Sequence, residues 1–354
     1  MPAHRVRIVA LAATTAATTA ALAIAGCSAP ADDPASEIVR TTTRIAGAAV
    51  IGIERDTTTA CALPSPTDPG LTAGSTHGVI HTAGVSEVPN DPQRIVVLDA
   101  ASLDAVCALG LWERVVGVGI APDERPEYLG TGVSEIPAIG SPGSPDLAAI
   151  EQARPDLIVG AAADTGLYES LSSVAPTVVV GSDQVFWRQQ FERVGESLGR
   201  SEAARRVLEE YSVAASELGR ELTSSQTQAS LVRFTGDGPT IDGTASFPGQ
   251  VLADLGAERP APQRFGVEDG RAYRPLDTED PSTADGDVIF VRFDGQNGLD
   301  RGTDYMQRDE WLDLGAVTDN RLFSVSDEVW STPGPVAAHA VLTDLRHSLN
   351  GYSN

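Results

Sequence analysis

The segment that decides the fold is FWRQQFERVGESLGRSEAARRVLEEYSVAASELGREL, residues 186–222. Its apolar side chains recur at helical spacing, while Glu and Arg fill the other faces. Gly199 is expected to break the run. Ser201 is expected to cap a second helix of about 20 residues, which spans roughly 30 Å at about 1.5 Å per residue. The segment therefore predicts a rigid helical connection, formed by the apolar residues Val194, Leu198, Val207, Leu208, Tyr211, Ala215, Leu218 and Leu222.

Strands alternate with helices on both sides of this segment. Such alternation predicts parallel sheets covered on both faces, with ligands bound at the carboxyl ends of the strands. We therefore expect an α/β protein with two Rossmann-like lobes joined by a long helix: an N-terminal lobe (76–185), a helical spine (186–224) and a C-terminal lobe (225–350). The expected strands are residues 94–99, 115–118, 155–160, 176–180, 229–235, 287–293 and 321–325, and the expected helices include 145–153, 167–174, 246–255 and 334–349.

The N-terminus has the pattern of an export signal. A positive start is followed by an apolar run from Ile8 to Ala25, and small residues precede Cys27. This pattern predicts a lipoprotein signal peptide over residues 1–26 and lipidation of Cys27 on the outer side of the cell membrane. A plain secretory signal and an uncleaved membrane helix are the alternatives. Residues 27–75, rich in Thr, Ala and Pro, are expected to form a tether that is disordered or loosely docked.

Two cysteines, Cys61 and Cys107, remain after Cys27. Export places them in an oxidising compartment, which favours a disulfide between them. Such a bond would attach the end of the tether to the first lobe. Two separate thiols are the alternative.

Charge and missing motifs narrow the function. The net charge is −24, and all 25 basic residues counted are arginines, which excludes nucleic-acid binding. The chain has no phosphate-binding loop, no Gly-x-Ser-x-Gly turn and no His-Glu-x-x-His helix. His77 and His81 lie four residues apart, but Gly78 and Gly84 favour a loop over a metal-binding helix. We therefore expect a binding protein rather than an enzyme, with no resident metal or cofactor.

Several segments carry a family resemblance. They are residues 92–99 (PQRIVVLD) followed by Leu103-Asp104, residues 140–149 leading into 153–158 (ARPDLI), residues 175–178 (APTV), residues 195–199 (GESLG) and residues 311–330. Over residues 85–349 the chain resembles the iron–siderophore-binding members of the ABC-importer substrate-binding proteins that have a helical spine. It is most similar to the ferric-citrate-type and carboxymycobactin-type lipoproteins. The resemblance implies a class III periplasmic-binding-protein-like fold and the delivery of a ferric siderophore, or haem, to an ABC permease. We expect the protein to be a monomer.

The resemblance also implies permease docking through one exposed acid on each lobe. On the second lobe the matching position is Glu279. On the first lobe it is Ala148, and Asp146 and Glu151 are the nearest acids; Asp146 is the candidate.

A ferric siderophore brings its own iron ligands, so the protein needs arginines for its oxygens and aromatic faces for its body. Arg233, in the middle of a strand, is expected to be paired on a sheet face instead. Trp187 and Trp330 have burial in the core as an equal alternative, and Tyr273 would ligate the iron if the cargo were haem. The candidate ligand contacts are Trp187, Phe247, Arg264, Phe265, Tyr273, Arg292, Phe293 and Trp330.

Three other functions remain open at this stage. The first is a haem-uptake receptor. The second is an exported metal-dependent enzyme on a similar scaffold, and the third is an envelope scaffold that recruits other proteins.

Overall fold

The computed structural model describes residues 43–162, 165–181, 183–266, 268 and 271–349. All of them belong to one compact unit, residues 38–354. The predicted signal peptide and the lipidated Cys27 lie outside the described residues. No helix in the described part of the chain combines the length and hydropathy of a membrane span.

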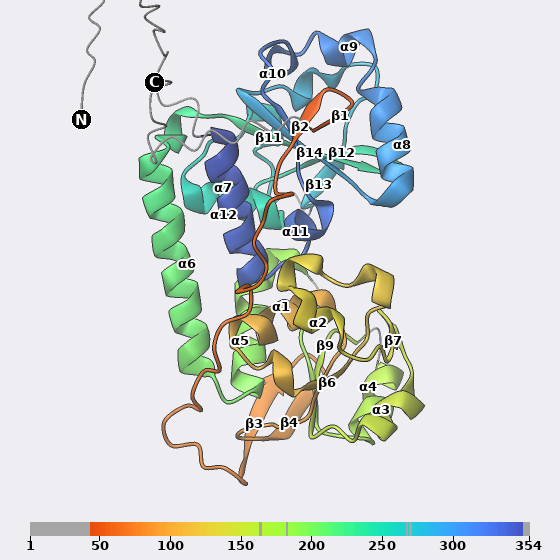
Figure 1. The fold of residues 1–354 in the computed structure, drawn as a ribbon, viewed down its shortest axis with the longest axis vertical. Helices are drawn as coiled ribbons and strands as arrows, with labels where there is room; N and C mark the ends of the chain where they lie inside the picture. The colour runs from red at the N-terminus through yellow and green to blue at the C-terminus, as the bar shows by residue number, and fades with distance from the viewer. Residues whose placement is uncertain (1–42, 163–164, 182, 267, 269–270, 350–354) are drawn as a thin grey trace, which may run out of the picture. The chain divides into compact units, whose positions relative to one another are not determined.

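The first lobe is built on a parallel four-stranded sheet with the order β10-β9-β5-β6. Strands β6 and β9 of this sheet are labelled in Figure 1. Alternate residues of β5 enter two different apolar clusters, so both faces of the sheet are covered, as the unbroken apolar runs predict. Its strands are β5 (Ile95–Val97), β6 (Val115–Val118), β9 (Leu157–Gly160) and β10 (Thr177–Val179), and its helices are α1 (Ala100–Ala108), α2 (Thr131–Ser134), α3 (Leu147–Ala153) and α4 (Thr165–Ser172). Two hairpins, β3 (Thr76–His81) with β4 (Gly84–Pro89) and β7 (Gly140–Ser141) with β8 (Ser144–Pro145), complete the lobe.

The second lobe has a separate seven-stranded sheet, ordered β1-β2-β15-β14-β11-β12-β13. Strands β2, β15, β14 and β11 run parallel, and the others are antiparallel to their neighbours. The strands are β1 (Arg44–Ile45), β2 (Ala48–Val50), β11 (Ala229–Thr235), β12 (Gly238–Asp242), β13 (Tyr273–Pro275), β14 (Val288–Phe293) and β15 (Leu322–Ser324). The helices are α7 (Phe247–Leu255), α8 (Gly295–Tyr305), α9 (Asp309–Leu312), α10 (Gly315–Thr318), α11 (Asp327–Ser331) and α12 (Pro335–Leu349).

Two consecutive helices, α5 (Trp187–Ser197) and α6 (Ser201–Glu221), connect the sheets, with the predicted break at Gly199 between them. One apolar core runs from β5 of the first lobe through both helices to β11 and β14 of the second. The helical connection is therefore part of the core rather than a hinge between two separate cores.

The capping residue of α6 differs from the prediction. The side chain of Ser201 makes no cap; instead the carboxylate of Asp68 accepts from the backbone N–H groups of Ser201 (2.6 Å) and Glu202 (2.9 Å). An acidic group at a helix N-terminus satisfies free donors and complements the helix dipole. Local sequence does not reveal this cap, because Asp68 lies more than 130 positions away along the chain.

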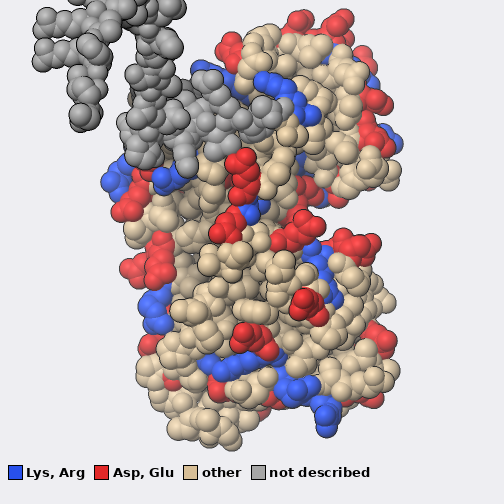
Figure 2. Space-filling model, viewed as in Figure 1, with Lys and Arg blue, Asp and Glu red and all other residues tan. Residues whose placement is uncertain are grey.

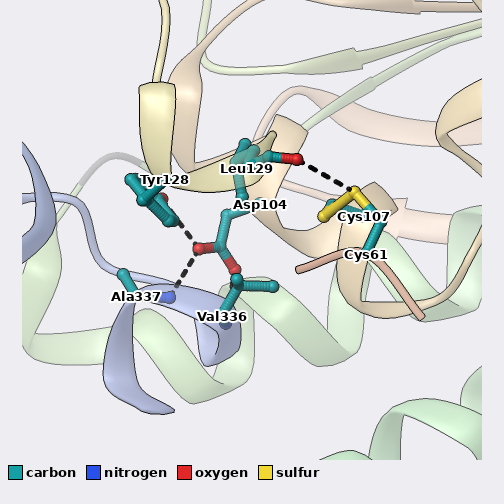
Figure 3. Close-up of a disulfide and its surroundings, with 7 residues drawn as sticks. All are labelled: Cys61, Asp104, Cys107, Tyr128, Leu129, Val336 and Ala337. Atoms are coloured by element: carbon teal, nitrogen blue, oxygen red, sulfur yellow. Dashed lines mark hydrogen bonds between the residues drawn. A yellow bond between two sulfur atoms is a disulfide. The ribbon is translucent and has the colours of Figure 1, made fainter. Parts of the chain in front are cut away.

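The N-terminal segment also differs from the loosely docked tether that the sequence predicts. We call residues 44–68 the strap. It starts as β1 and β2 on the edge of the second-lobe sheet, where the N–H of Ile51 also donates to the carbonyl of Ser324 (2.9 Å). It then reaches the first lobe, where Cys61 and Cys107 form the expected disulfide (Figure 3). The strap is thus a second connection between the lobes, in addition to α5 and α6.

Candidate inter-lobe binding site

A groove of about 920 Å³ lies between the strap and the two lobes. Its walls come from strap residues 45–57, from first-lobe residues 127–134, and from second-lobe residues at and after the carboxyl ends of β14 and β15. This volume is within the range of about 300–1,000 Å³ typical of small-molecule sites. In the space-filling view the surface is hollowed at the boundary between the lobes, with acidic side chains along the rim (Figure 2). Its apolar lining residues include Ile45, Val50, Ile51, Ile53, Phe293, Leu299, Val325 and Val329.

Two arginines lie beside the groove, near the carboxyl ends of parallel strands. Arg233 of β11 and Arg292 of β14 are register partners, so both side chains leave the same face of the sheet. Preceding positions on that face, Leu231 and Phe290, belong to the apolar core. The face therefore changes from apolar to charged as it approaches the first lobe.

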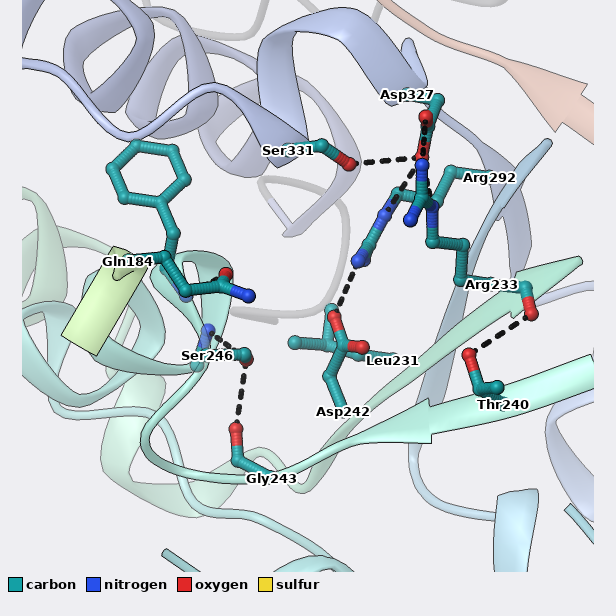
Figure 4. Close-up of polar contacts among 12 residues, drawn as sticks. Gln184, Leu231, Arg233, Thr240, Asp242, Gly243, Ser246, Arg292, Asp327 and Ser331 are labelled. Carbon is teal, nitrogen blue, oxygen red and sulfur yellow. Dashed lines mark hydrogen bonds and ion pairs between the residues drawn. The ribbon is translucent and has the colours of Figure 1, made fainter. Parts of the chain in front are cut away.

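Asp327, the first residue of α11, holds both arginines (Figure 4). Its carboxylate accepts from Nε and Nη2 of Arg233, both at 2.8 Å, from Nε of Arg292 at 3.0 Å, and from the hydroxyl of Ser331 at 2.9 Å. On its other side, Arg292 forms an ion pair with Asp242 at 2.6 Å. We call these residues, Arg233, Asp242, Arg292, Asp327 and Ser331, the arginine–aspartate cluster.

The charges of the cluster are strongly coupled. Burial opposes the charge of Arg233, but its ion pairs, chiefly with Asp327, outweigh burial and raise its pKa. A third arginine, Arg259, is buried behind Asp242 and donates to the carbonyls of Ala229 and Asp242, both at 2.6 Å. Burial lowers the pKa of Arg259 to about 9, although Asp242 partly offsets that effect.

Two carboxyl groups with raised pKa values lie where the lobes meet. Burial raises the pKa of Glu328, a groove residue on α11, to about 7. A hydrogen bond with the backbone of Glu127 lowers this pKa, and the negative charge of the Glu127 side chain raises it further. Burial also raises the pKa of Asp104 to about 6. Asp104, on α1 of the first lobe, accepts from the N–H groups of Val336 and Ala337 at the start of α12 and from the hydroxyl of Tyr128 (Figure 3). The contact between the lobes therefore contains groups that titrate close to neutral pH.

Three aromatic candidates for ligand binding, Trp187, Phe247 and Trp330, lie in the core. Trp187 is 1 % exposed and packs edge-on against Tyr211 and Phe247, and Trp330 packs against Phe290. The indole N–H of Trp330 donates to Asp344, which also binds Arg55 of the strap. None of these three aromatic residues lines the groove.

The remaining candidates divide into two groups. Arg292 belongs to the cluster, and Phe293 lines the groove. Arg264, Phe265 and Tyr273 lie elsewhere in the second lobe. Arg264 forms an ion pair with Glu258 (3.4 Å), Phe265 is buried beneath the guanidinium of Arg274, and Tyr273 is exposed on the edge strand β13. The structure thus brings two of the eight candidates to the groove and its cluster.

The two predicted docking acids lie on different surfaces. Glu279 is exposed in the turn after β13. Asp146 is also exposed, but its carboxylate caps α3 by accepting from the N–H groups of Ala148 and Ala149.

The sequence prediction missed the strap and Asp327. The pairing of Arg233 is as expected, but its partner lies 94 positions away, so no local pattern reveals it. The strap residues gave no signal because β2 is only three residues long. In the described part of the chain, no group of three or more His, Cys, Asp or Glu residues is arranged to hold a metal ion.

This geometry defines a class of protein. Two α/β lobes with separate sheets, a rigid helical connection and a groove at the carboxyl ends of strands are typical of extracytoplasmic ligand receptors. A family model described as "Periplasmic binding protein" matches residues 95–329. The chain belongs to this family, whose members are substrate-binding proteins.

Individual relatives agree with this assignment. "Probable siderophore-binding lipoprotein YfiY" of Bacillus subtilis (strain 168) is 27% identical over 286 residues, which cover 78% of this chain and 88% of the relative. "Fe(3+)-citrate-binding protein YfmC" of the same organism is 24% identical over 264 residues, 72% of this chain and 79% of the relative. The crystal structure of Staphylococcus aureus SirA complexed with staphyloferrin B superposes with a TM-score of 0.67 at 25% identity and covers 78% of this chain and 99% of SirA.

Proposed function

We propose that this protein captures a ferric siderophore in the inter-lobe groove and delivers it to an ABC importer for iron uptake. The observation that carries the proposal is the groove itself, a space of about 920 Å³ between two lobes, with an apolar wall and a cluster of arginines beside it. The names of the relatives, which refer to siderophores and ferric citrate, support the same cargo.

The groove suits a cargo that is already chelated. A siderophore surrounds its iron with its own oxygen or nitrogen ligands, so the protein needs only hydrogen-bond donors for the periphery and apolar surface for the body of the chelate. Arg233 and the apolar residues of the groove supply both kinds of contact. We expect no resident cofactor and no catalysis. The relatives' names favour chelated iron over haem and over a metal-dependent enzyme.

The cellular setting is part of the proposal. Lipidation at Cys27 would anchor the protein to the outer side of the cell membrane, and the names of two relatives contain the word lipoprotein. Glu279 and Asp146 remain the candidate contacts with the permease. We expect the protein to act as a monomer.

The test is a titration of the chain starting at Ser28 with ferric citrate, ferrichrome, ferrioxamine B, haem and cobalamin, followed by tryptophan fluorescence and calorimetry. We expect saturable binding of at least one ferric siderophore. A matched pair of variants then locates the site. Thr131→Trp places a large ring at an exposed position that lines the groove, and Thr318→Trp places the same ring on α10, outside the groove.

Thr131→Trp should weaken binding at least about tenfold, because lost contacts and steric overlap of this size exceed about 1.4 kcal/mol. Thr318→Trp should leave the affinity unchanged. If no ferric siderophore binds, or if both variants bind as the unmodified chain does, the proposal is wrong.

A further inference from the structure

Asp294 has an unusual position at the edge of the groove. It lies between Phe293 and Gly295, which both line the groove, and immediately precedes α8. The side chain makes no capping hydrogen bond to that helix. Its carboxylate instead lies 3.3 Å from Nη2 of Arg233.

The guanidinium of Arg233 keeps donors that can bind a ligand. Arg233 gives Nε and Nη2 to Asp327, while Nη1 has no acceptor among the residues that the structure describes. The Arg233 side chain keeps 29% of its surface exposed. An edge formed by Nη1 and Nη2 is the part of a guanidinium that binds a carboxylate through two parallel hydrogen bonds.

Asp294 is the most exposed acid that contacts Arg233 or Arg292. Its side chain is 52% exposed, against 16% for Asp327 and 4% for Asp242. Asp327 is held by several donors and Asp242 by its ion pair with Arg292, so these two less exposed acids form part of the permanent structure of the cluster. Asp294 is therefore the acid among these three that an incoming anion can most readily approach.

We propose that Asp294 determines the charge selectivity of the site by competing with the cargo for the Nη1–Nη2 edge of Arg233. A chelate with a peripheral carboxylate must displace Asp294 and approach its negative charge, whereas a neutral or cationic chelate does neither. The native site therefore favours ferric siderophores that lack peripheral carboxylates. This inference rests on the proposed function, which it extends to the chemical class of the cargo.

The magnitude follows from the exposure of the pair. A half-exposed ion pair is a weak interaction, and like charges across an open site are screened by water and salt. Replacement of Asp294 by a neutral residue should therefore change affinity for an anionic chelate by a factor of about three to ten. The change should shrink as the salt concentration rises.

The test compares Asp294→Asn with Asp300→Asn, using ferric citrate as the anionic probe, ferrichrome as the neutral probe and ferrioxamine B as the cationic probe. Asp300 is an exposed acid on α8 that accepts from Gln296, with no ion pair to the cluster, and serves as the matched control. Asp294→Asn should tighten ferric citrate about threefold to tenfold and leave ferrichrome unchanged. It should leave ferrioxamine B unchanged or slightly weaker. Asp300→Asn should alter none of the three affinities.

Failure of the selectivity inference and failure of the proposed function give different results. If Asp294→Asn changes all three affinities by the same factor, or changes them no more than Asp300→Asn does, the selectivity inference is overturned while the proposed function stands. If the unmodified chain binds none of the probes, and no siderophore in the wider panel, the proposed function is overturned.

Discussion

Asp104 allows a quantitative test of the contact between the lobes. Its carboxylate is fully buried, lies on α1 of the first lobe, and accepts from two backbone N–H groups of α12, both at 2.9 Å. The burial of a charge is unfavourable, and the pKa of Asp104 is accordingly raised from 3.8 to about 6. The perturbation is Asp104→Asn, which keeps the shape of the side chain and removes the titration.

The sign follows from the direction of the pKa change. The folded chain binds the Asp104 proton more tightly than the unfolded chain does. The contribution of this group to the free energy of unfolding therefore has its full value only below the unfolded pKa of 3.8. That contribution is lost as the pH rises to 6. A pKa difference from 3.8 to about 6 corresponds to about 3 kcal/mol, at 1.36 kcal/mol for each pH unit.

The assay is urea unfolding of the unmodified chain and of Asp104→Asn between pH 4 and 7, with exposed Asp313→Asn as the control. The free energy of unfolding of the unmodified chain, minus that of Asp104→Asn, should fall by about 2 kcal/mol over this range, because the carboxyl of the unfolded chain is already partly ionised at pH 4. The corresponding difference for Asp313→Asn should be almost constant. A difference for Asp104→Asn that stays constant within about 1 kcal/mol would show that the carboxyl is not held as a buried anion.

Three further predictions concern other parts of the structure. Reduction of the Cys61–Cys107 disulfide should lower the free energy of unfolding by about 2–4 kcal/mol, measured by urea unfolding with and without reductant; a Cys61→Ser, Cys107→Ser double variant that still responded to reductant would contradict this. The unmodified chain should lose about 1–3 kcal/mol more of its free energy of unfolding than Glu328→Gln does as the pH rises from about 4.5 to 7, because only the carboxyl ionises. Identical pH profiles of the two chains in urea unfolding would contradict the raised pKa. Gly219→Val should destabilise the fold by about 3 kcal/mol or more, because a Cβ at this position would lie 1.9 Å from the carbonyl oxygen of Leu255. A melting temperature within about 2 °C of that of the unmodified chain would disprove the close approach of α6 and α7.

The sequence predicts the α/β elements well, because their signals are local. Short apolar runs mark β5, β9 and β14, and helical spacing marks α6. The break at Gly199 follows from a single residue whose φ of +65° suits glycine. Each of these features depends on residues a few positions apart.

The site is less predictable because its contacts join distant parts of the chain. The pattern at Trp187 and Trp330 shows two large aromatics near strand ends, but not whether they face a ligand or the core. Their partners, Tyr211 and Phe290, come from other elements. Only the packing of α5, α7 and α11 against the sheet shows that both indoles are buried.

The same limit explains the strap. A strand of three residues, Ala48–Val50, has too little pattern to be recognised, and it is stabilised by pairing with β15 near the other end of the chain. Arg292 is a milder case: its position at a strand end indicated the site, but its two acidic partners were not evident from the sequence.

The position of β2 has a consequence for the order in which the molecule assembles. Ala49 is synthesised early, yet its partner in the sheet is Phe323, roughly 270 residues later. The Cys61–Cys107 bond joins residues only 46 positions apart and can close long before that partner exists. Pairs so far apart in sequence form slowly, because a long loop must close first. Strand β2 therefore lacks its partner β15 until nearly the whole chain has been made, and during that interval β2 is exposed to pairing with another molecule.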